Sequence, residues 1–468
     1  MAIKDKIRAT GKQIYDRLHN DRLRKNILSA IPYWVASLLV GLIAVYYGRA
    51  FSWAENMGMQ LFTTHRYLLF IIPPIAFVVA WWLVKQFAPF ARGSGNPQVI
   101  AAIELAKPHN EEKLTKLLGL RIIFIKILSS LVFIFGGGVI GREGPIIHIG
   151  SSVFRKVNEW LPDWWPKVSK RYMIMTGAAA GLAAAFNTPL GGIVFAMEEL
   201  TKTHISNFRT SIFSALIIAG LTTQALAGPF LYLGYPNVTH LSNFVFIPVI
   251  IVAIISGVGG SALGYYVLKI LKWKESFKHT YQTILYIVIG AFILAFIAYF
   301  IDIRVLNSGK DLMTNTLFSS DKHLPWYLPI LRTVGVIICN PMGGAAGIMV
   351  NSLSAGSTVG AVVGGWLHLS ATDTNVLILA GMAAFLTGIS RTPFTCAILV
   401  LEMTDRHTLI FHLLLAAMVA NMAALIIDRH SFYDRVKDKF IDELNKEEAK
   451  GIEQKNKMVE TTLPTTNL

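Results

Sequence analysis

The feature that most constrains this chain is a succession of apolar segments, each long enough to enter or cross a lipid bilayer. A helix needs about 20 predominantly apolar residues to span the hydrocarbon core. The segments lie at about residues 27–50, 67–90, 118–140, 172–198, 211–234, 245–272, 283–303, 326–340, 344–366, 376–402 and 408–427. Of the 468 residues, 53% are hydrophobic and only 15% are charged, whereas soluble domains carry about 25% charged residues. The sequence therefore predicts an all-α, polytopic membrane protein.

Several of these segments are interrupted by glycine and proline. The interruptions fall at Pro73-Pro74, at Gly136 to Gly144 and at Gly343 to Gly347. A broken helix at membrane depth is tolerated only where protein or a polar cavity satisfies the freed backbone groups. The sequence therefore predicts many tilted and broken helices, and the breaks indicate a transport pathway.

The chain also repeats itself. NTPLGGIVFAMEE (residues 187–199) resembles RTPFTCAILVLEM (residues 391–403), so that Glu198 matches Glu402 at an offset of 204 residues. Weak internal symmetry is typical of transporters whose binding site lies at the interface between the repeats. We therefore predict two membrane repeats, at residues 30–235 and 236–440. The sequence alone leaves open whether the second repeat is inverted.

The charges fit a membrane protein better than a nucleic-acid-binding one. The net charge of +15 comes from 43 Lys and Arg against 28 Asp and Glu, and the basic residues flank apolar spans instead of forming one face. Cytoplasmic flanks collect Lys and Arg. Residues 1–29 are expected to form a basic cytoplasmic or interfacial helix, since they lack the apolar core of a cleaved signal peptide. Residues 441–468 are expected to form a short cytoplasmic tail.

Nothing in the sequence indicates a metal site or an enzyme. Cys339 and Cys396 lie in apolar surroundings without ligand-like spacing, so we interpret them as buried bystanders. The 12 histidines form no HExxH motif and lack close carboxylate spacing. GGGVIG (residues 136–141) fits G-x-G-x-x-G formally, but it follows an apolar helix pattern instead of a strand. A membrane-embedded enzyme is therefore disfavoured, and no cofactor is expected.

Glu143 in GREGP (residues 141–145) is the first candidate functional residue. A carboxylate in an apolar region is costly, so it is a functional candidate by default. Pro145 stands where the first turn of a helix accepts proline, and the free N–H groups of such a turn bind anions. Glu143 can fill this site with its own carboxylate or leave it on protonation. The alternative is a structural helix cap.

Three further segments carry candidate residues with ordinary structural alternatives. In GSGNP (residues 93–97), Ser94 can donate to an anion while its glycines let the backbone approach, although a simple turn has the same composition. GIMVNSLSAG (residues 347–356) begins a helix after a glycine-rich break, and its alternative is a plain loop-to-helix junction. Tyr433 ends the last apolar span, where tyrosine is most often an interfacial belt residue.

Three further charged residues stand in apolar segments. Glu198 and Glu199 end one apolar span, and one of them can serve as an inner proton station, although a terminal carboxylate is usually just solvated. Lys126 stands in an otherwise apolar helix, so it needs a partner or a water-filled vestibule, where it would attract anions.

Together these segments resemble the CLC family of chloride channels and proton/chloride exchangers over about residues 30–440. GSGNP is similar to the family's GSGIP element, GREGP is its gating-glutamate motif unchanged, and GIMVN stands in the place of GIFxP. FNTPLGGIVFAMEE and LVLEMTD (residues 399–405) are close matches as well. The resemblance implies a CLC-type fold of two inverted helical repeats, and a homodimer with one anion pathway in each subunit.

The resemblance also implies roles for individual residues. Glu143 would be the external gating glutamate, which competes with chloride and carries the proton, and Glu199 would be the internal proton glutamate. The implied chloride ligands are the hydroxyls of Ser94 and Tyr433 and the backbone N–H groups of Ile348 and Met349. The implied backbone of the anion site includes Gly93, Gly95, Arg142 and Gly144.

Three positions depart from the family pattern: Asn96 replaces the usual Ile, Met349 the usual Phe, and Asn351 the usual Pro. The backbone donors can survive these changes, whereas the apolar constriction beside the central site is altered. The predicted function is proton-coupled chloride antiport, because Glu143 is accompanied by Glu199. The altered constriction keeps a passive, acid-activated chloride channel as the alternative.

The expected partners follow from this function. They are chloride, protons and the lipid bilayer, with chloride as substrate and no nucleic acid. The predicted location is the inner cell membrane, with several spans and with both termini on the cytoplasmic side.

Overall fold

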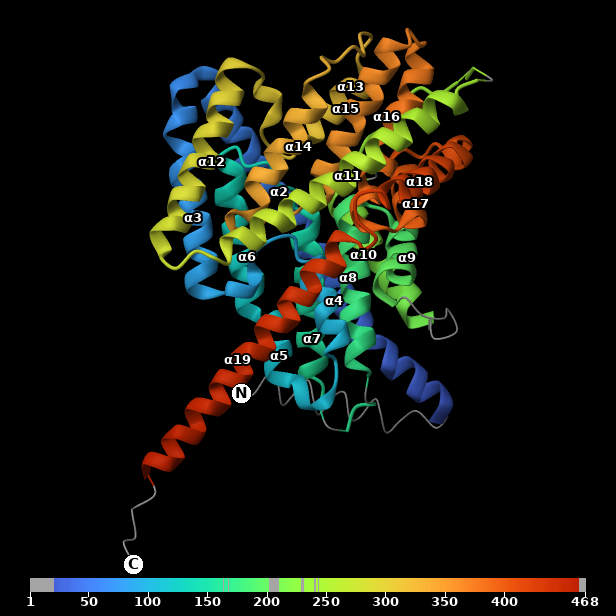
Figure 1. Ribbon diagram of the computed structural model, residues 1–468. Helices are drawn as coiled ribbons and strands as arrows, with labels where there is room; N and C mark the ends of the chain where they lie inside the picture. Colours follow the sequence, from blue (N-terminus) through green and yellow to red (C-terminus); the bar gives the residue numbers. More distant parts are fainter. Residues whose placement is uncertain are drawn as a thin grey trace, which may run out of the picture.

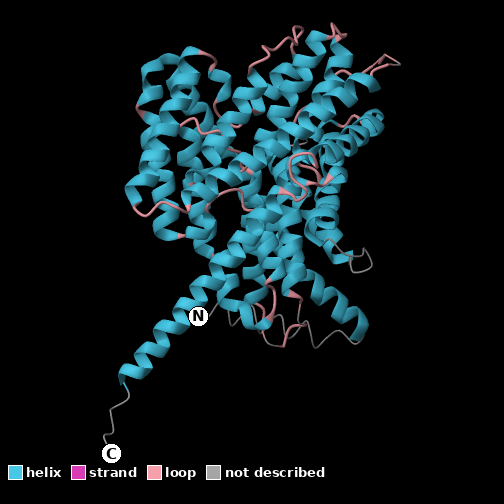
Figure 2. Ribbon diagram, in the orientation of Figure 1, coloured by secondary structure: helices cyan, strands magenta, loops and turns pink. Residues whose placement is uncertain are grey.

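A computed structural model describes residues 21–162, 164–166, 168–201, 210–228, 231–239, 241–242 and 244–462. Within these residues the regular structure is helical, and no strand is present (Figure 2). The predicted all-α class is therefore confirmed. Many helices are short or tilted across the bundle (Figure 1), as the glycine and proline breaks indicated.

The first half of the chain contains helices from α2 to α10, with short turns between them. Their bounds are α2 (Asp21–Thr64), η1 (Arg66–Phe70), α3 (Ile72–Phe87), η2 (Pro89–Ala91), α4 (Asn96–Glu104), η3 (Pro108–Asn110), α5 (Glu111–Leu117), α6 (Leu120–Phe135), α7 (Glu143–Glu159), α8 (Lys170–Phe186), α9 (Pro189–Phe195), η4 (Ala196–Thr201) and α10 (Thr210–Ala227). The η4 segment is a π-helix, a wider turn that is frequent at functional sites.

The second half of the chain contains helices from α11 to α19. Their bounds are α11 (Phe246–Lys274), α12 (Thr280–Phe300), η6 (Ile303–Val305), α13 (Lys310–Phe318), α14 (Leu328–Cys339), η7 (Asn340–Met342), α15 (Met349–Trp366), α16 (Ala371–Ser390), α17 (Pro393–Thr404), η8 (His407–Leu409), α18 (Ile410–Ala424) and α19 (Phe432–Thr462). Proline stands in the first turn of α14 and α17, where its missing N–H costs no hydrogen bond.

The helices divide into those that face lipid and those that are enclosed. Seven helical spans in the described part of the chain are long and apolar enough to cross a bilayer. The most apolar part of α12 is 39% buried within the protein, whereas that of α16 is 94% buried. Large apolar side chains such as Phe292 and Phe296 are accordingly exposed on α12. The chain is a multi-pass membrane protein whose centre is built from enclosed helices.

The enclosed helices are built alike in the two halves. A Cβ atom on Gly150 of α7 would lie 2.3 Å from the carbonyl oxygen of Gly177 on α8. The corresponding pair in the second half is Gly356 of α15 and Gly381 of α16, where the distance would be 2.1 Å. Only glycine permits either crossing, because any side chain would strike the facing backbone. The repeated glycines therefore mark two equivalent helix crossings, one in each repeat.

Two glutamates join the repeats reciprocally. The carboxylate of Glu402 accepts hydrogen bonds from the N–H groups of Leu190 (3.1 Å) and Gly191 (2.8 Å), in the first turn of α9. The carboxylate of Glu198 accepts the equivalent bonds from Phe394 (3.2 Å) and Thr395 (2.7 Å), in the first turn of α17. Each glutamate therefore caps the helix of the other repeat. Such an exchange requires a local two-fold relation between the repeats.

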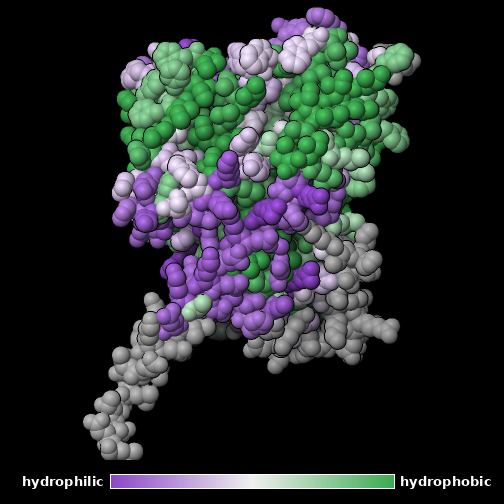
Figure 3. All heavy atoms as spheres, in the orientation of Figure 1, coloured by the Kyte–Doolittle hydropathy of each residue, from purple (hydrophilic) through white to green (hydrophobic). Residues whose placement is uncertain are grey.

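The ends of the described chain lie on one side of the bundle. The first turns of α2 and the outer part of α19 both point away from the bundle at the lower end of Figure 1. In the face shown in Figure 3, apolar atoms cover the upper part and hydrophilic atoms gather around α19. Residues 1–20 of the predicted N-terminal segment and residues 463–468 of the predicted tail lie outside the described residues.

The predicted domain boundaries near the ends fall inside helices. Residues 21–29 are the first turns of α2, which continues into the membrane span, and the boundary at residue 440 falls within α19. The reason is that α19 buries Phe432, Tyr433 and Phe440 on one side, while its charged face forms ion pairs such as Lys116–Glu447 at 3.0 Å. The boundary between the repeats at residue 235 stays a prediction.

The reciprocal caps predict a stability change in Glu402→Ala. The substitution removes both acceptors of the α9 turn in an apolar environment, and the cost should be about 1–3 kcal/mol in the free energy of unfolding. We expect a lower thermal unfolding midpoint in detergent and a partial recovery in Glu402→Gln, which keeps one oxygen acceptor. As a control, Glu443→Ala removes a partly exposed ion pair and should cost about 0–1 kcal/mol. Equal midpoints for the two alanine variants would contradict the capping role.

Candidate functional site

Three glycine-rich loops meet at the centre of the bundle. Gly141 and Gly347 exchange backbone hydrogen bonds, of 2.9 Å and 3.2 Å. The Gly93 N–H donates to the Gly344 carbonyl at 2.8 Å, and the Ala346 N–H donates to the Gly93 carbonyl at 3.1 Å. The backbone N–H and carbonyl groups of the three loops therefore pair with one another, as a membrane interior without water requires. The GSGNP, GREGP and GIMVN segments, which are far apart in the sequence, are brought together.

Each of these loops ends in the first turn of a helix. Helix α4 begins at Asn96, α7 at Glu143 and α15 at Met349. Among the described residues, no side chain of the preceding residue caps any of these three helices. The first N–H groups of a helix have no partner within the helix and carry a partial positive charge. The centre of the bundle is therefore suited to an anion.

Two hydroxyl groups lie beside these helix starts. Ser94 is 4% exposed and Tyr433 is 1% exposed, and the Tyr433 hydroxyl lies next to the side chains of Ser94 and Asn96. Within the described residues, neither the Ser94 Oγ nor the Tyr433 hydroxyl has a hydrogen-bond partner. A Cβ on Gly144 would lie 2.5 Å from the Ser94 Oγ, so only glycine lets α7 start this close. Two buried donors thus remain for a ligand.

The carboxyl group of Glu143 lies next to this centre and is only 1% exposed. Its Oε1 accepts a hydrogen bond from the Tyr232 hydroxyl at 3.1 Å and lies 3.8 Å from the Arg142 Nε. Sequence reasoning missed Tyr232, because the segment that follows α10 contains no motif that marks a tyrosine as a partner of a distant carboxyl.

Lys126 was expected to need either a partner or a water-filled vestibule, and the structure gives it backbone carbonyl groups as partners. Its side chain is fully buried, and its Nζ donates to the carbonyl oxygens of Ala91 and Gly93, both at 3.1 Å. The ammonium group therefore holds the loop that precedes Ser94.

The two neighbouring glutamates at the end of the α9 span have different surroundings. Glu198 caps α17, as described above. Glu199 is 2% exposed and interacts electrostatically with Tyr433. Both belong to the π-helical turn η4, a kind of turn that is frequent at functional sites. Of the two glutamates, Glu199, the residue that the resemblance implies, is therefore the one that is buried and interacts electrostatically with Tyr433.

Two of the three departures from the family pattern contact each other. The side-chain amide of Asn96 donates to the Sδ atom of Met349 at 3.7 Å, and both residues are buried. Thioether sulfur is a weak acceptor, so the contact is a weak hydrogen bond. A polar contact between the two side chains thus replaces the apolar pair of the family pattern.

The third departure, Asn351, binds a buried guanidinium group. Arg332 is fully buried, and its Nη2 donates to the Asn351 Oδ1 at 2.9 Å. The Nη1 and Nη2 atoms of Arg332 also donate to carbonyl oxygens of residues 305–308, at 2.8 to 3.1 Å. A proline at position 351 would lack this acceptor. Asn351 therefore ties α15 to the loop that precedes α13.

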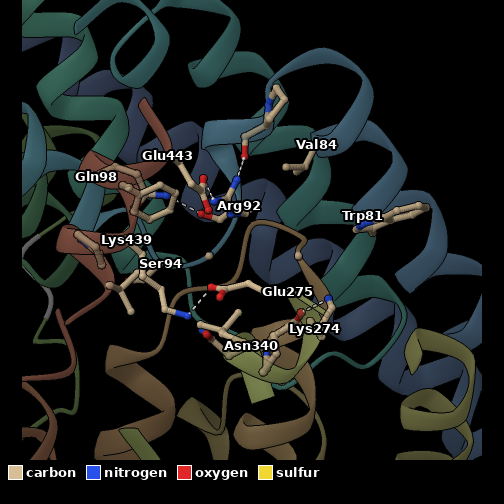
Figure 4. A pocket seen from close by; sticks show the side chains of 18 of the residues that line it. Trp81, Val84, Arg92, Ser94, Gln98, Lys274, Glu275, Asn340, Lys439 and Glu443 are labelled. Atoms are coloured by element: carbon tan, nitrogen blue, oxygen red, sulfur yellow. Dashed lines mark hydrogen bonds and ion pairs between the residues drawn. The ribbon is translucent and has the colours of Figure 1, made fainter. Parts of the chain in front are cut away.

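A cavity of about 330 Å³ is lined by Ser94 and by side chains of α3, α4, α11 and α19 (Figure 4). Its mouth contains two ion pairs, Arg92–Glu443 and Lys439–Glu275, which connect α19 to the rest of the wall. Its remaining charged residues are Lys85 and Lys274, which donate to the Thr280 hydroxyl and the Pro341 carbonyl. The excess of positive charge favours the entry of anions.

Comparison with known proteins agrees with this arrangement. The family model described as voltage gated chloride channel matches residues 75–425. The chain belongs to this family. It is 28% identical over 429 residues to the H(+)/Cl(-) exchange transporter ClcA of Salmonella arizonae, and 28% identical over 423 residues to that of Salmonella newport. In both comparisons, 86% of this chain and 86% of the relative are covered.

Solved structures show the same fold. A slow cyanobacterial Cl-/H+ antiporter gives a TM-score of 0.76 at 23% identity, covering 89% of this chain and 99% of that one. A CLC-type fluoride/proton antiporter gives a TM-score of 0.71 at 20% identity, covering 89% and 98%. The predicted CLC-type fold is therefore confirmed.

The contact between Arg332 and Asn351 predicts a coupled effect on stability. Asn351→Leu leaves a guanidinium donor without its acceptor, which should lower the free energy of unfolding by about 1–3 kcal/mol. Arg332→Met should be destabilising as well, because the carbonyl groups of residues 305–308 lose their donors. In the double variant the unpaired charge is gone, so its cost should be less than the sum of the single costs. Thermal unfolding in detergent measures all three variants. Additive costs would show that the contact contributes nothing.

Proposed function

We propose that this protein exchanges chloride for protons across the membrane. The observation that carries the proposal is the meeting of two buried hydroxyl groups and three uncapped helix starts beside the buried carboxyl of Glu143. Hydroxyl and backbone dipoles suit an anion, and the carboxyl group suits a proton. The exchange activity in the names of the ClcA relatives supports the same function.

Chloride is proposed to bind at the centre of the bundle. The hydroxyls of Ser94 and Tyr433 would donate to it, together with the N–H groups of Ile348 and Met349 at the start of α15. The backbone of Gly93, Gly95, Arg142 and Gly144 would line the site. These donors carry partial charges only, so an anion can be bound selectively and still be released.

Glu143 is proposed to couple the two ions. When it is ionised, its carboxylate competes with chloride for the positive helix start. When it takes up a proton, its charge is lost and it can leave the site to chloride. One group that either binds a proton or yields to an anion links the two movements. The proposal involves no covalent chemistry apart from this proton transfer, so we assign no enzymatic activity and no cofactor.

Glu199 is proposed to pass protons between Glu143 and the inner side. Its burial and its electrostatic interaction with Tyr433 support this role. Chloride would use the separate, positively charged cavity that reaches Ser94. We place this side in the cytoplasm and the protein in the inner cell membrane, since the ends of α2 and α19 lie there (Figure 1) and basic flanks favour the cytoplasm.

The functional unit is proposed to be a homodimer in which each subunit has its own pathway. Large apolar side chains are exposed on α9, α10, α17 and α18, including Leu190, Leu221, Phe394, Phe411 and Met422. Such a face supports pairing with a second copy.

Glu143→Gln should abolish proton movement and leave chloride flux, because the amide cannot release a proton. In proteoliposomes, the reversal potential of the unmodified protein should shift when a pH gradient is imposed at fixed chloride. The reversal potential of Glu143→Gln should stay at the chloride equilibrium potential. Glu159→Gln, at the other end of α7, is the matched control and should behave as the unmodified protein does. A reversal potential of the unmodified protein that ignores the pH gradient would contradict exchange and indicate a passive channel.

Glu199→Gln should reduce proton flux while chloride flux persists, because the inner proton station is lost. Glu198→Gln is the neighbouring control: its side chain caps α17, so it should lower the unfolding midpoint without changing the ratio of proton to chloride flux. Both fluxes are measured in the same proteoliposomes with a pH electrode and a chloride electrode. An equal loss of both fluxes in Glu199→Gln would indicate a folding defect and contradict the proton role.

A further inference from the structure

The hydrogen bond from Tyr232 to Glu143 has no part in the function proposed above. Tyr232 lies in the connection between α10 and α11, which extends toward the end of the bundle opposite α19 (Figure 1). The side chain is only 4% exposed, and its hydroxyl reaches the Glu143 Oε1 at 3.1 Å. A donor from a connecting segment therefore contacts the one carboxyl group on which coupling depends.

The position of Tyr232 is held from several sides. Its ring contacts Phe186 edge to face, with the ring centroids 4.9 Å apart. The Lys310 Nζ lies 4.6 Å from the ring centroid, within the range of a cation–π interaction. The next residue, Leu233, donates its N–H to the Met403 carbonyl at 3.1 Å. Because ring and backbone are both held, the hydroxyl is aimed at Glu143.

Two positively charged side chains lie near the carboxyl group of Glu143. Arg142 lies 3.8 Å from the carboxyl, and Lys310 interacts electrostatically with it as well. The acidic residue Glu55 is engaged by the N–H (2.8 Å) and hydroxyl (2.6 Å) of Ser308. The charged and titratable groups around Glu143 and Tyr232 are Tyr47, Glu55, Arg142, Lys310 and Asp311.

We propose that Tyr232 and Lys310 are positioning residues of a latch that holds ionised Glu143 in its closed position and sets the pH at which exchange begins. The hydroxyl donates to the carboxylate, and the ammonium group stabilises both the ring and the negative charge. Protonation of Glu143 removes that charge and weakens both interactions. The carboxyl group is then released. This inference rests on the gating role proposed for Glu143.

The latch is tested by the pH dependence of exchange in Tyr232→Phe. The variant keeps the ring and removes only the hydroxyl, so the carboxylate loses one donor and binds a proton at higher pH. Chloride and proton flux are measured in proteoliposomes over a series of pH values, with the same pH on both sides. The pH of half-maximal exchange should move upward by about one unit, the effect of one hydrogen bond to a charged group.

Three further variants separate the latch from a general structural effect. Tyr286→Phe removes a hydrogen bond of equal length, 3.1 Å, to the Ile338 carbonyl, and it should leave the pH profile unchanged. Lys310→Met should move the profile upward as Tyr232→Phe does, whereas Lys310→Arg keeps the positive charge and should restore the original profile. A similar shift in Tyr286→Phe, or no shift in Lys310→Met, would overturn the latch.

The outcome distinguishes the latch from the function on which it rests. If Tyr232→Phe leaves the pH profile unchanged or moves it downward, while flux through Glu143→Gln is independent of pH, the latch is wrong and the gating role stands. If flux through Glu143→Gln keeps the pH dependence of the unmodified protein, the gating role is wrong and the latch falls with it. An upward shift in Tyr232→Phe, absent in the Glu143→Gln background, supports both.

Discussion

The arrangement of this protein depends on one constraint: a broken helix inside a membrane must find partners for its backbone groups without water. In this protein the loops at three helix breaks hydrogen-bond to one another. Gly141 pairs with Gly347, and Gly93 pairs with Gly344 and Ala346. These contacts satisfy backbone groups of all three loops. The first N–H groups of the helices and the hydroxyls of Ser94 and Tyr433 remain at the centre as donors. The positive ends of three helices therefore lie together at the centre of the bundle.

The two repeats build a symmetric frame around an asymmetric site. Glu198 and Glu402 occupy equivalent positions, and each caps a helix of the other repeat. The neighbouring Glu199 corresponds to Met403, and Glu143 corresponds to Met349, at the offsets of 204 and 206 residues that relate the repeats. Carboxyl groups therefore stand in the first repeat where the second carries thioethers. The symmetry supports the fold, and the proton chemistry is confined to the positions where the symmetry is broken.

Much of the centre could be predicted from local patterns. GSGNP, GREGP and the segment at residues 347–356 are glycine-rich loops that precede helices, and this property is visible in a few consecutive residues. Tyr232 could not be predicted, because its role depends on a contact with a residue 89 positions away. The same is true of Asn351, which differs from the family pattern for a reason that only Arg332 reveals. A contact between distant residues leaves no mark in either local sequence.

The sequence by itself determined that the chain is helical, that it spans a membrane, that it is built from two related halves, and which loops carry the chemistry. These properties follow from hydrophobicity, helix breakers and internal similarity, all of which are read over short windows. Only the tertiary structure decided that Glu198 caps α17, which side chains contact Glu143, and how the departures at positions 96, 349 and 351 are accommodated. The reason is physical: burial and hydrogen-bond geometry are properties of residues that meet in space, and the order of residues along the chain does not contain those distances.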